Sequence, residues 1–130
     1  MPKQILIVDD NEDSCQVFTR LLTKEGYAVT LAKDGAEGLQ RVAQSRPDLI
    51  LLDVMLPGIN GFEVCRTIKS DPSLRSIPIL IISAGIDPAI QEQGLNVGAE
   101  ALLTKPIRPP DLIAKIKGYF NNQHSSPSTP

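Results

Sequence analysis

Residues 4–10 have the sequence Gln-Ile-Leu-Ile-Val-Asp-Asp, a short aliphatic and β-branched run followed at once by two carboxylates. A continuous apolar run of this length predicts a strand that is buried on both faces of a sheet. The arrangement recurs at 49–53, where Leu-Ile-Leu-Leu precedes Asp53, and at 79–83, where Ile-Leu-Ile-Ile precedes Ser83. The sequence therefore predicts three buried strands, each followed by a polar side chain.

Helical patterns and two weaker strands fill the rest of the chain. The weaker strands are expected at 27–32 and 101–104. Cap residues, glycines, prolines and apolar stripes predict the helices. These are a helix ending at Gly26 that carries Val17, Phe18, Leu21 and Leu22, a helix from Asp34 to about Gln44, a helix opened by Asn60 with Glu63, a helix from Asp87-Pro88 to Gly98, and a helix after Pro109-Pro110.

Length and element order define the fold class. The chain has 130 residues, which suits a single domain. Strands that alternate with helices predict an α/β fold, a doubly wound parallel sheet with helices on both faces. We expect the domain at 1–120, and a disordered tail or linker stub at 121–130, where the sequence has no formal charge and almost no apolar content.

Composition excludes several classes of protein. The net charge of −2 argues against an electrostatic nucleic-acid binder. The longest apolar runs are about five residues, far short of the roughly twenty that a membrane span needs. No secretory signal is visible, so we expect a cytoplasmic protein, with Cys15 and Cys65 as small core residues. No GxGxxG or GK[ST] motif is present, and the one histidine, His124, lies in the polar tail.

The polar residues at the strand ends are the candidate site, because ligands of such sheets bind beyond the carboxyl ends of the strands. The candidates are Asp9 and Asp10 after the first strand, Asp53 after the third, Ser83 after the fourth and Lys105 after the fifth. Each alone has an ordinary structural explanation: a turn, a cap, a satisfied hydroxyl or a surface charge. Their common position is what favours a function.

Taken together, these side chains predict a metal and phosphoryl site. Three carboxylates brought close together repel one another unless a cation neutralises them. Oxygen ligands without His or Cys favour Mg²⁺ before Ca²⁺. A lysine and a hydroxyl opposite the metal can hold a phosphoryl group, and a carboxylate can accept it as an acyl phosphate.

Four motifs follow one another along the chain: Ile5-Leu-Ile-Val-Asp-Asp-Asn11, Leu51-Leu-Asp-Val-Met-Leu-Pro-Gly-Ile-Asn-Gly61, Ile81-Ile-Ser-Ala-Gly85, and Gly98-Ala99 through Thr104-Lys105-Pro106. In these motifs and their order, the sequence resembles the receiver domains of bacterial two-component response regulators, over about residues 3–120. The resemblance implies a flavodoxin-like sheet of strand order 2-1-3-4-5 with five helices.

The resemblance also implies a role for each candidate residue. Asp53 is the expected phosphoacceptor, Ser83 the hydroxyl that moves toward the phosphoryl group, and Lys105 the lysine that pairs with its oxygens. The expected Mg²⁺ ligands are Asp10 and Asp53 directly, Asp9 mainly through metal-bound water, and the backbone carbonyl of Met55. The peptide between Lys105 and Pro106 is expected to be cis.

One position departs from the family pattern. Three residues before Lys105 the family usually has Tyr or Phe, whose ring moves inward on activation, and this chain has Leu102. A leucine can occupy the inward position at little cost, so we expect its rotamer to depend little on phosphorylation. The response is then expected mainly in the segments that follow Ser83 and Asp53.

The leading functional prediction is a phosphorylation-controlled switch, not an enzyme acting on separate substrates. A sensor histidine kinase or phosphotransfer protein is the expected donor, and a downstream protein the expected target, without direct binding of nucleic acid or membrane by this domain. The alternative is a constitutive interaction module of the same fold, for which Leu102 is the one argument. A small phosphatase or phosphotransferase is a third interpretation, but no further catalytic group is visible.

Overall fold

A five-stranded parallel sheet forms the centre of the computed structural model, which describes residues 2–54, 58, 60–85 and 88–125, the last four by backbone alone. The strands are β1 (Gln4–Val8), β2 (Ala28–Ala32), β3 (Leu49–Asp53), β4 (Ile79–Ser83) and β5 (Ala101–Thr104). Their order is β2-β1-β3-β4-β5, and all neighbours are parallel. The predicted fold class and strand order are confirmed.

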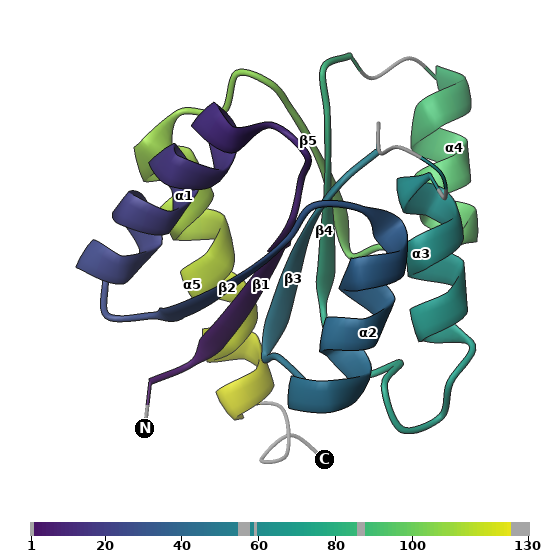
Figure 1. The fold of residues 1–130 in the computed structure, drawn as a ribbon, viewed down its shortest axis with the longest axis horizontal. Coiled ribbons are helices and arrows are strands. Elements are labelled where there is room, and N and C mark those ends of the chain that lie inside the picture. Colours follow the sequence, from purple (N-terminus) through teal and green to yellow (C-terminus); the bar gives the residue numbers. More distant parts are fainter. Residues whose placement is uncertain (1, 55–57, 59, 86–87, 126–130) are drawn as a thin grey trace.

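Helices cover both faces of the sheet. The described residues form α1 (Glu12–Lys24), α2 (Gly35–Ser45), α3 (Gly61–Lys69), α4 (Pro88–Asn96) and α5 (Pro109–Ser125). In Figure 1, α1 and α5 lie against one face, and α2, α3 and α4 lie against the other. This layering explains why the central strands are apolar along their whole length: neither face meets water.

The side-chain alternation of the strands divides the core into two clusters. Leu6, Ile50 and Ile81 face α2 and α3, where they pack with Val64 and Ile68. The other face is built by Ile5, Ile7, Leu49, Leu51, Leu80 and Ile82, which pack against α1 and α5 through Phe18, Leu22, Leu112, Ile116 and Phe120. Cys15 and Cys65 each lie in one of these clusters, as expected for small core residues.

Side-chain caps begin three of the helices. The Asn11 side chain accepts a hydrogen bond from the N–H of Ser14, and Asp34 and Asn60 do the same for α2 and α3. The predicted caps at Asp34 and Asn60 are confirmed. Pro88 is the first residue of α4, as predicted, while the predicted cap, Asp87, lies outside the described residues.

Two predictions about the helices need correction. Val17 was placed on the buried face of α1, but it is 58% exposed. The buried positions are Cys15, Phe18 and Leu22, which follow one helical face more closely. Residues 121–125 were assigned to a tail, but α5 continues through Ser125. Residues 121–125 contain no glycine or proline, the residues that most strongly disfavour a helix interior.

Candidate functional site

The carboxyl ends of the strands meet at one edge of the sheet. The N–H of Asp9 donates to the carbonyl of Ala32 at 3.0 Å, which ties the end of β1 to β2. The N–H of Lys105 donates to the carbonyl of Ser83 at 2.7 Å, which ties the end of β5 to β4. Main-chain hydrogen bonds therefore bring residues from β1, β4 and β5 to the same edge as Asp53.

Three carboxylates gather there. An oxygen from each of Asp9, Asp10 and Asp53 lies within 4.8 Å of the others. Asp9 is 3% exposed and Asp53 is 6% exposed, whereas Asp10 is exposed. The structure thus brings together the three acids that the sequence singled out, two of them in a buried setting where a charge is costly.

Asp9 is held in place from its own loop. Its side chain accepts a hydrogen bond from the N–H of Asn11 at 2.9 Å, and its carbonyl accepts one from the thiol of Cys15 at 3.3 Å. Burial raises the pKa of Asp9 above its ordinary value, and the Asp53 carboxylate adds to the rise, against the opposing effect of the Asn11 N–H. Ionised Asp9 is therefore electrostatically unfavourable beside Asp53.

Lys105 is the cation that faces the acids. Its ammonium lies 3.2 Å from Asp53 Oδ2 and 3.4 Å from Asp9 Oδ2. Burial by itself would lower the pKa of Lys105, but the carboxylates of Asp53 and Asp9 outweigh it, so the pKa is raised. The lysine is therefore charged at neutral pH and bridges two of the three acids.

The donor set fits a divalent cation. The cluster has three carboxylates and one ammonium, which contacts two of them, so the side chains alone leave excess negative charge when all three acids are ionised. The available donors are oxygens, without imidazole or thiolate ligands, and such sets suit Mg²⁺. The fourth predicted ligand, the Met55 carbonyl, lies outside the described residues.

Ser83 lies at the same edge with its hydroxyl turned toward its own loop. The hydroxyl donates to the carbonyl of Gly85 at 2.7 Å, and it accepts the N–H of Gly85 at 3.4 Å. Ser83 is 3% exposed. The peptide between Lys105 and Pro106 is cis, as expected.

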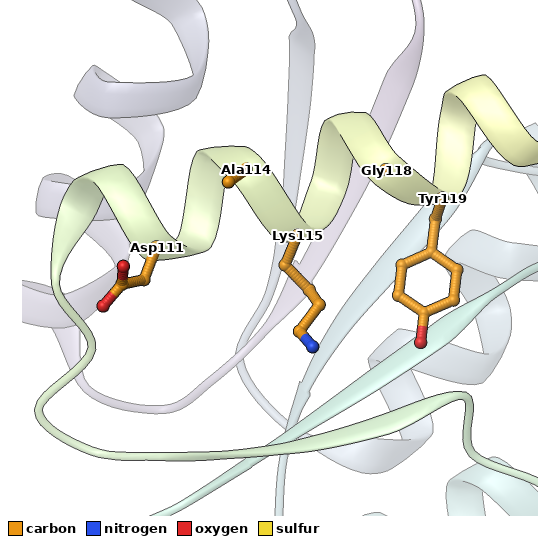
Figure 2. Close-up of a pocket in the computed structure, with 5 residues that line it drawn as sticks. All are labelled: Asp111, Ala114, Lys115, Gly118 and Tyr119. Carbon is orange, nitrogen blue, oxygen red and sulfur yellow. The ribbon is translucent and has the colours of Figure 1, made fainter.

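A hollow in the described surface lies elsewhere. It has a volume of about 600 Å³ and is lined by Asp111, Ala114, Lys115, Gly118 and Tyr119. Figure 2 shows that all five come from successive turns of α5, and that the polar ends of Asp111, Lys115 and Tyr119 extend away from the helix. The Tyr119 hydroxyl already donates to the carbonyl of Glu100 at 2.9 Å. A shallow face of one helix, without buried polar groups directed into it, is a weaker site than the acid cluster.

Comparison with known families agrees with this geometry. The sequence model of the response regulator receiver domain matches residues 5–117. The chain belongs to this family. Receiver domains are signalling switches of two-component systems, and they interact with histidine kinases and downstream effectors.

Relatives of this receiver domain include named response regulators. It is 44% identical over 117 residues to the response regulator PleD of Caulobacter vibrioides, covering 90% of this chain and 26% of PleD. It is 35% identical over 128 residues to the DNA-binding response regulator MtrA of Mycolicibacterium smegmatis, covering 98% of this chain and 55% of MtrA. The chain therefore spans only about a quarter to a half of these relatives.

A solved structure matches almost the whole receiver domain. The CheY-like receiver domain protein from Methanospirillum hungatei JF-1 superposes with a TM-score of 0.91 at 29% identity, covering 97% of this chain and 99% of the other. Among the described residues, no helix is long and apolar enough to span a bilayer. Fold and family therefore rest on agreement between sequence and structure.

Two contacts of the receiver domain were not predicted from the sequence. The Cys15 thiol donates to the Asp9 carbonyl, although the sequence marks Cys15 only as a core residue. Gly61, the first residue of α3, packs on the backbone of Asp53 and Val54. The pairing of Asn60 with a following glycine is the only sequence signal for the second contact, and it predicts a helix start without predicting what the helix contacts.

Proposed function

We propose that Asp53 accepts a phosphoryl group from a phosphohistidine of a partner kinase or phosphotransfer protein, and that the resulting acyl phosphate changes the binding of a downstream protein. The observation that carries this proposal is the position of Lys105, 3.2 Å from a buried Asp53 carboxylate that lies beside two further acids. A purely structural ion pair does not require a third carboxylate beside the two that contact the lysine.

The chemistry assigns one step to each side chain. A carboxylate oxygen of Asp53 forms the new P–O bond while the P–N bond of phosphohistidine breaks, and the leaving imidazole takes up a proton. Lys105 moves from the carboxylates to the phosphoryl oxygens, where its charge stabilises the transition state. The Ser83 hydroxyl exchanges the carbonyl of Gly85 for a phosphoryl oxygen.

Mg²⁺ is the cofactor that the acid cluster fits. Asp10 and Asp53 would hold it directly, Asp9 mainly through water, and the Met55 carbonyl would complete the protein ligands. Bound there, the ion supplies positive charge that offsets carboxylate repulsion and the negative charge of the phosphoryl group. Held in position, Asp53 and Lys105 would act on an oriented donor, so positioning and charge stabilisation would both contribute to the rate.

Phosphorylation by a small donor tests the proposal. With Mg²⁺ and acetyl phosphate, the intact protein is expected to gain the mass of one phosphoryl group. Asp53→Ala is expected to gain none. Equal labelling of wild type and Asp53→Ala would show that another residue is the acceptor, and no labelling of wild type would remove the proposed function.

A constitutive interaction module is the second candidate, and the packing of Leu102 supports it. Leu102 lies on β5 and packs against the core cluster that faces α2 and α3. A Cβ added at Gly94 of α4 would lie 2.9 Å from Leu102 Cδ2 and 3.0 Å from its Cγ, with Cδ1 closer still. Leu102 thus already lies against Gly94 of α4. A side chain that keeps the same position in both states gives only a small population shift.

The hypothesis that the Leu102 rotamer depends little on phosphorylation predicts which residues respond to it. With beryllofluoride and Mg²⁺, amide shift changes away from the acids are expected in the segments after Ser83 and Asp53, and little change is expected at 101–103. Leu102→Tyr is expected to gain a response at β5. If residues 100–120 of wild type show the largest remote changes and Leu102 switches rotamer, the hypothesis is wrong.

A further inference from the structure

Helix α3 begins directly against the strand end that carries Asp53. Its first residue, Gly61, is buried, and the N–H of Gly61 donates to the carbonyl of Val54 at 3.0 Å. Asn60 precedes it and caps the helix by accepting the N–H of Glu63 at 3.0 Å. The chain therefore leaves the sheet after Asp53 and returns to the same strand end at Gly61.

This return is possible only for a residue without a side chain. A Cβ at position 61 would lie 2.9 Å from the Cα of Val54 and 3.1 Å from the carbonyl carbon of Asp53, and it would approach the carbonyl oxygen of Asp53 more closely still. All three are backbone atoms, so no rotamer change can relieve the clash. An alanine at 61 must displace either α3 or the backbone of Asp53 and Val54.

Displacement of that backbone moves the reacting group. The contacted carbonyl and the carboxylate belong to the same residue, Asp53. The carboxylate lies 3.2 Å from the ammonium of Lys105, and one oxygen of each of the three acids lies within 4.8 Å of the others. Strand pairing fixes Asp53 on its sheet side, where the N–H of Val54 donates to Ile82 at 3.0 Å. Gly61 supports the same peptide from the helix side.

We propose that Gly61 is a positioning residue for Asp53: the absence of a side chain lets α3 hold the backbone of the phosphoacceptor at the place where its carboxylate meets Lys105 and the other acids. The inference rests on the proposed function of Asp53. It assigns to the start of α3 a part in phosphoryl transfer in addition to its part in the core.

The added methyl group is small, but its expected effect on the reaction rate is large. Displacements of about 1 Å at a reacting group can lower rates by roughly a hundredfold. Mg²⁺ also tolerates little departure from octahedral ligand geometry. Gly61→Ala is therefore expected to slow labelling by acetyl phosphate at least roughly tenfold, and to reduce the rise in melting temperature that Mg²⁺ produces.

Two other glycines provide matched controls, because each receives the same methyl group. A Cβ at Gly118 of α5 meets no atom within 4 Å, so Gly118→Ala tests the substitution without a clash. The three atoms nearest to a Cβ at Gly94 all belong to the side chain of Leu102, a side chain that can change rotamer, so Gly94→Ala tests a clash away from the acids. Both controls are expected to keep the labelling rate and the Mg²⁺ response of wild type.

A stabilised background keeps the test usable if Gly61→Ala alone unfolds. Gly118→Ala replaces a helical glycine, and Arg46→Gly relieves a residue whose φ is +46° at the end of α2. Each is expected to add about 0.5–1 kcal/mol to the free energy of unfolding. Gly61→Ala is then compared with this background at a temperature at which far-UV circular dichroism shows both proteins folded.

The outcomes separate the inference from the proposed function. Slower labelling and a smaller Mg²⁺ response in folded Gly61→Ala, with both controls unchanged, support the positioning role. Wild-type labelling and Mg²⁺ response in folded Gly61→Ala overturn it, and so does a loss of stability without a change in either. Absence of labelling in wild type would instead overturn the function proposed for Asp53.

Discussion

Two lysines hold the two ends of the sheet, and they differ in how fully their charge is matched. Lys69, at the end of α3, lies at the amino ends of β4 and β5, where it pairs with Glu100. Lys105 lies at the carboxyl ends, where it pairs with Asp9 and Asp53. Both contacts join segments far apart in the sequence.

The contact at the amino ends is complete. The ammonium of Lys69 donates to the carbonyl of Arg75 at 3.0 Å, to that of Ile77 at 2.8 Å and to Glu100 Oε2 at 2.9 Å. Three donors thus have three acceptors. The other oxygen of Glu100 accepts the N–H of Ile79 at 2.7 Å. One positive charge meets one negative charge, and the polar groups named here are all paired.

The contact at the carboxyl ends is not balanced. Lys105 meets the carboxylates at 3.2 and 3.4 Å, longer distances than those around Lys69, and a third acid lies within the same cluster. Matched charges stabilise a fold without attracting a ligand, whereas buried excess negative charge attracts a cation. The difference distinguishes a structural ion pair from a site.

Replacing each lysine by alanine is expected to give the largest effects. The two variants are expected to differ in whether the labelling rate changes. Lys105→Ala is expected to slow acetyl phosphate labelling by roughly a hundredfold at saturating Mg²⁺, because it removes the charge that meets the phosphoryl oxygens. Lys69→Ala is expected to leave the labelling rate unchanged. It should instead lower the free energy of unfolding by about 1–3 kcal/mol, because acceptors at the amino ends lose their donor.

Mg²⁺ separates the two losses of stability. Lys105→Ala also leaves Asp9 and Asp53 without their cation, so its melting temperature is expected to fall without Mg²⁺ and to recover with it. Lys69→Ala keeps the acid cluster, so its melting temperature is expected to stay below that of wild type by the same amount with and without Mg²⁺. Equal Mg²⁺ rescue of the two variants, or equal labelling rates, would contradict the distinction between the two ends.

A smaller effect is expected from neutralising one acid. The pKa of Asp9 in the fold is raised above its unfolded value, so the ionised form costs stability, and this cost appears as pH rises above about 3.8. At neutral pH and without Mg²⁺, Asp9→Asn is therefore expected to melt a few degrees higher than wild type. The advantage should vanish at acid pH, where wild-type Asp9 is protonated.

Asp10→Asn is the comparison for that prediction. Asp10 is exposed, so its neutralisation should raise the melting temperature less than Asp9→Asn. As the expected direct ligand, it should reduce Mg²⁺ stabilisation more. Thermal melts of the two variants with and without Mg²⁺ would contradict this assignment if Asp10→Asn kept the full Mg²⁺ effect.

The fold was predictable from the sequence where physical signals are local. Continuous apolar runs identify β1, β3 and β4 because both faces of these strands are covered. Asp34 and Asn60 identify helix starts because caps act within one turn. The tail prediction at 121–125 was wrong because polar residues without glycine or proline are compatible with either state, and α5 continues through them.

The residues of the site could be predicted from the sequence, but the contacts that hold them in position could not. A carboxylate directly after a buried strand is unusual enough to mark Asp9 and Asp53, and parallel strands bring such residues to one edge. The contacts of Gly61 and Cys15 depend on distances between elements, which spacing along the chain does not encode. The packing of Leu102 beside Gly94 is of the same kind.

The most direct test of the central claim, that the unbalanced acids receive a cation and a phosphoryl group, is the amide spectrum of wild type with Mg²⁺ and beryllofluoride, a phosphoryl mimic. The account predicts saturable shifts that require both additions, largest around Asp9, Asp53, Ser83 and Lys105, with no such change in Asp53→Ala. An unchanged wild-type spectrum, or the same shifts in Asp53→Ala, would contradict the claim.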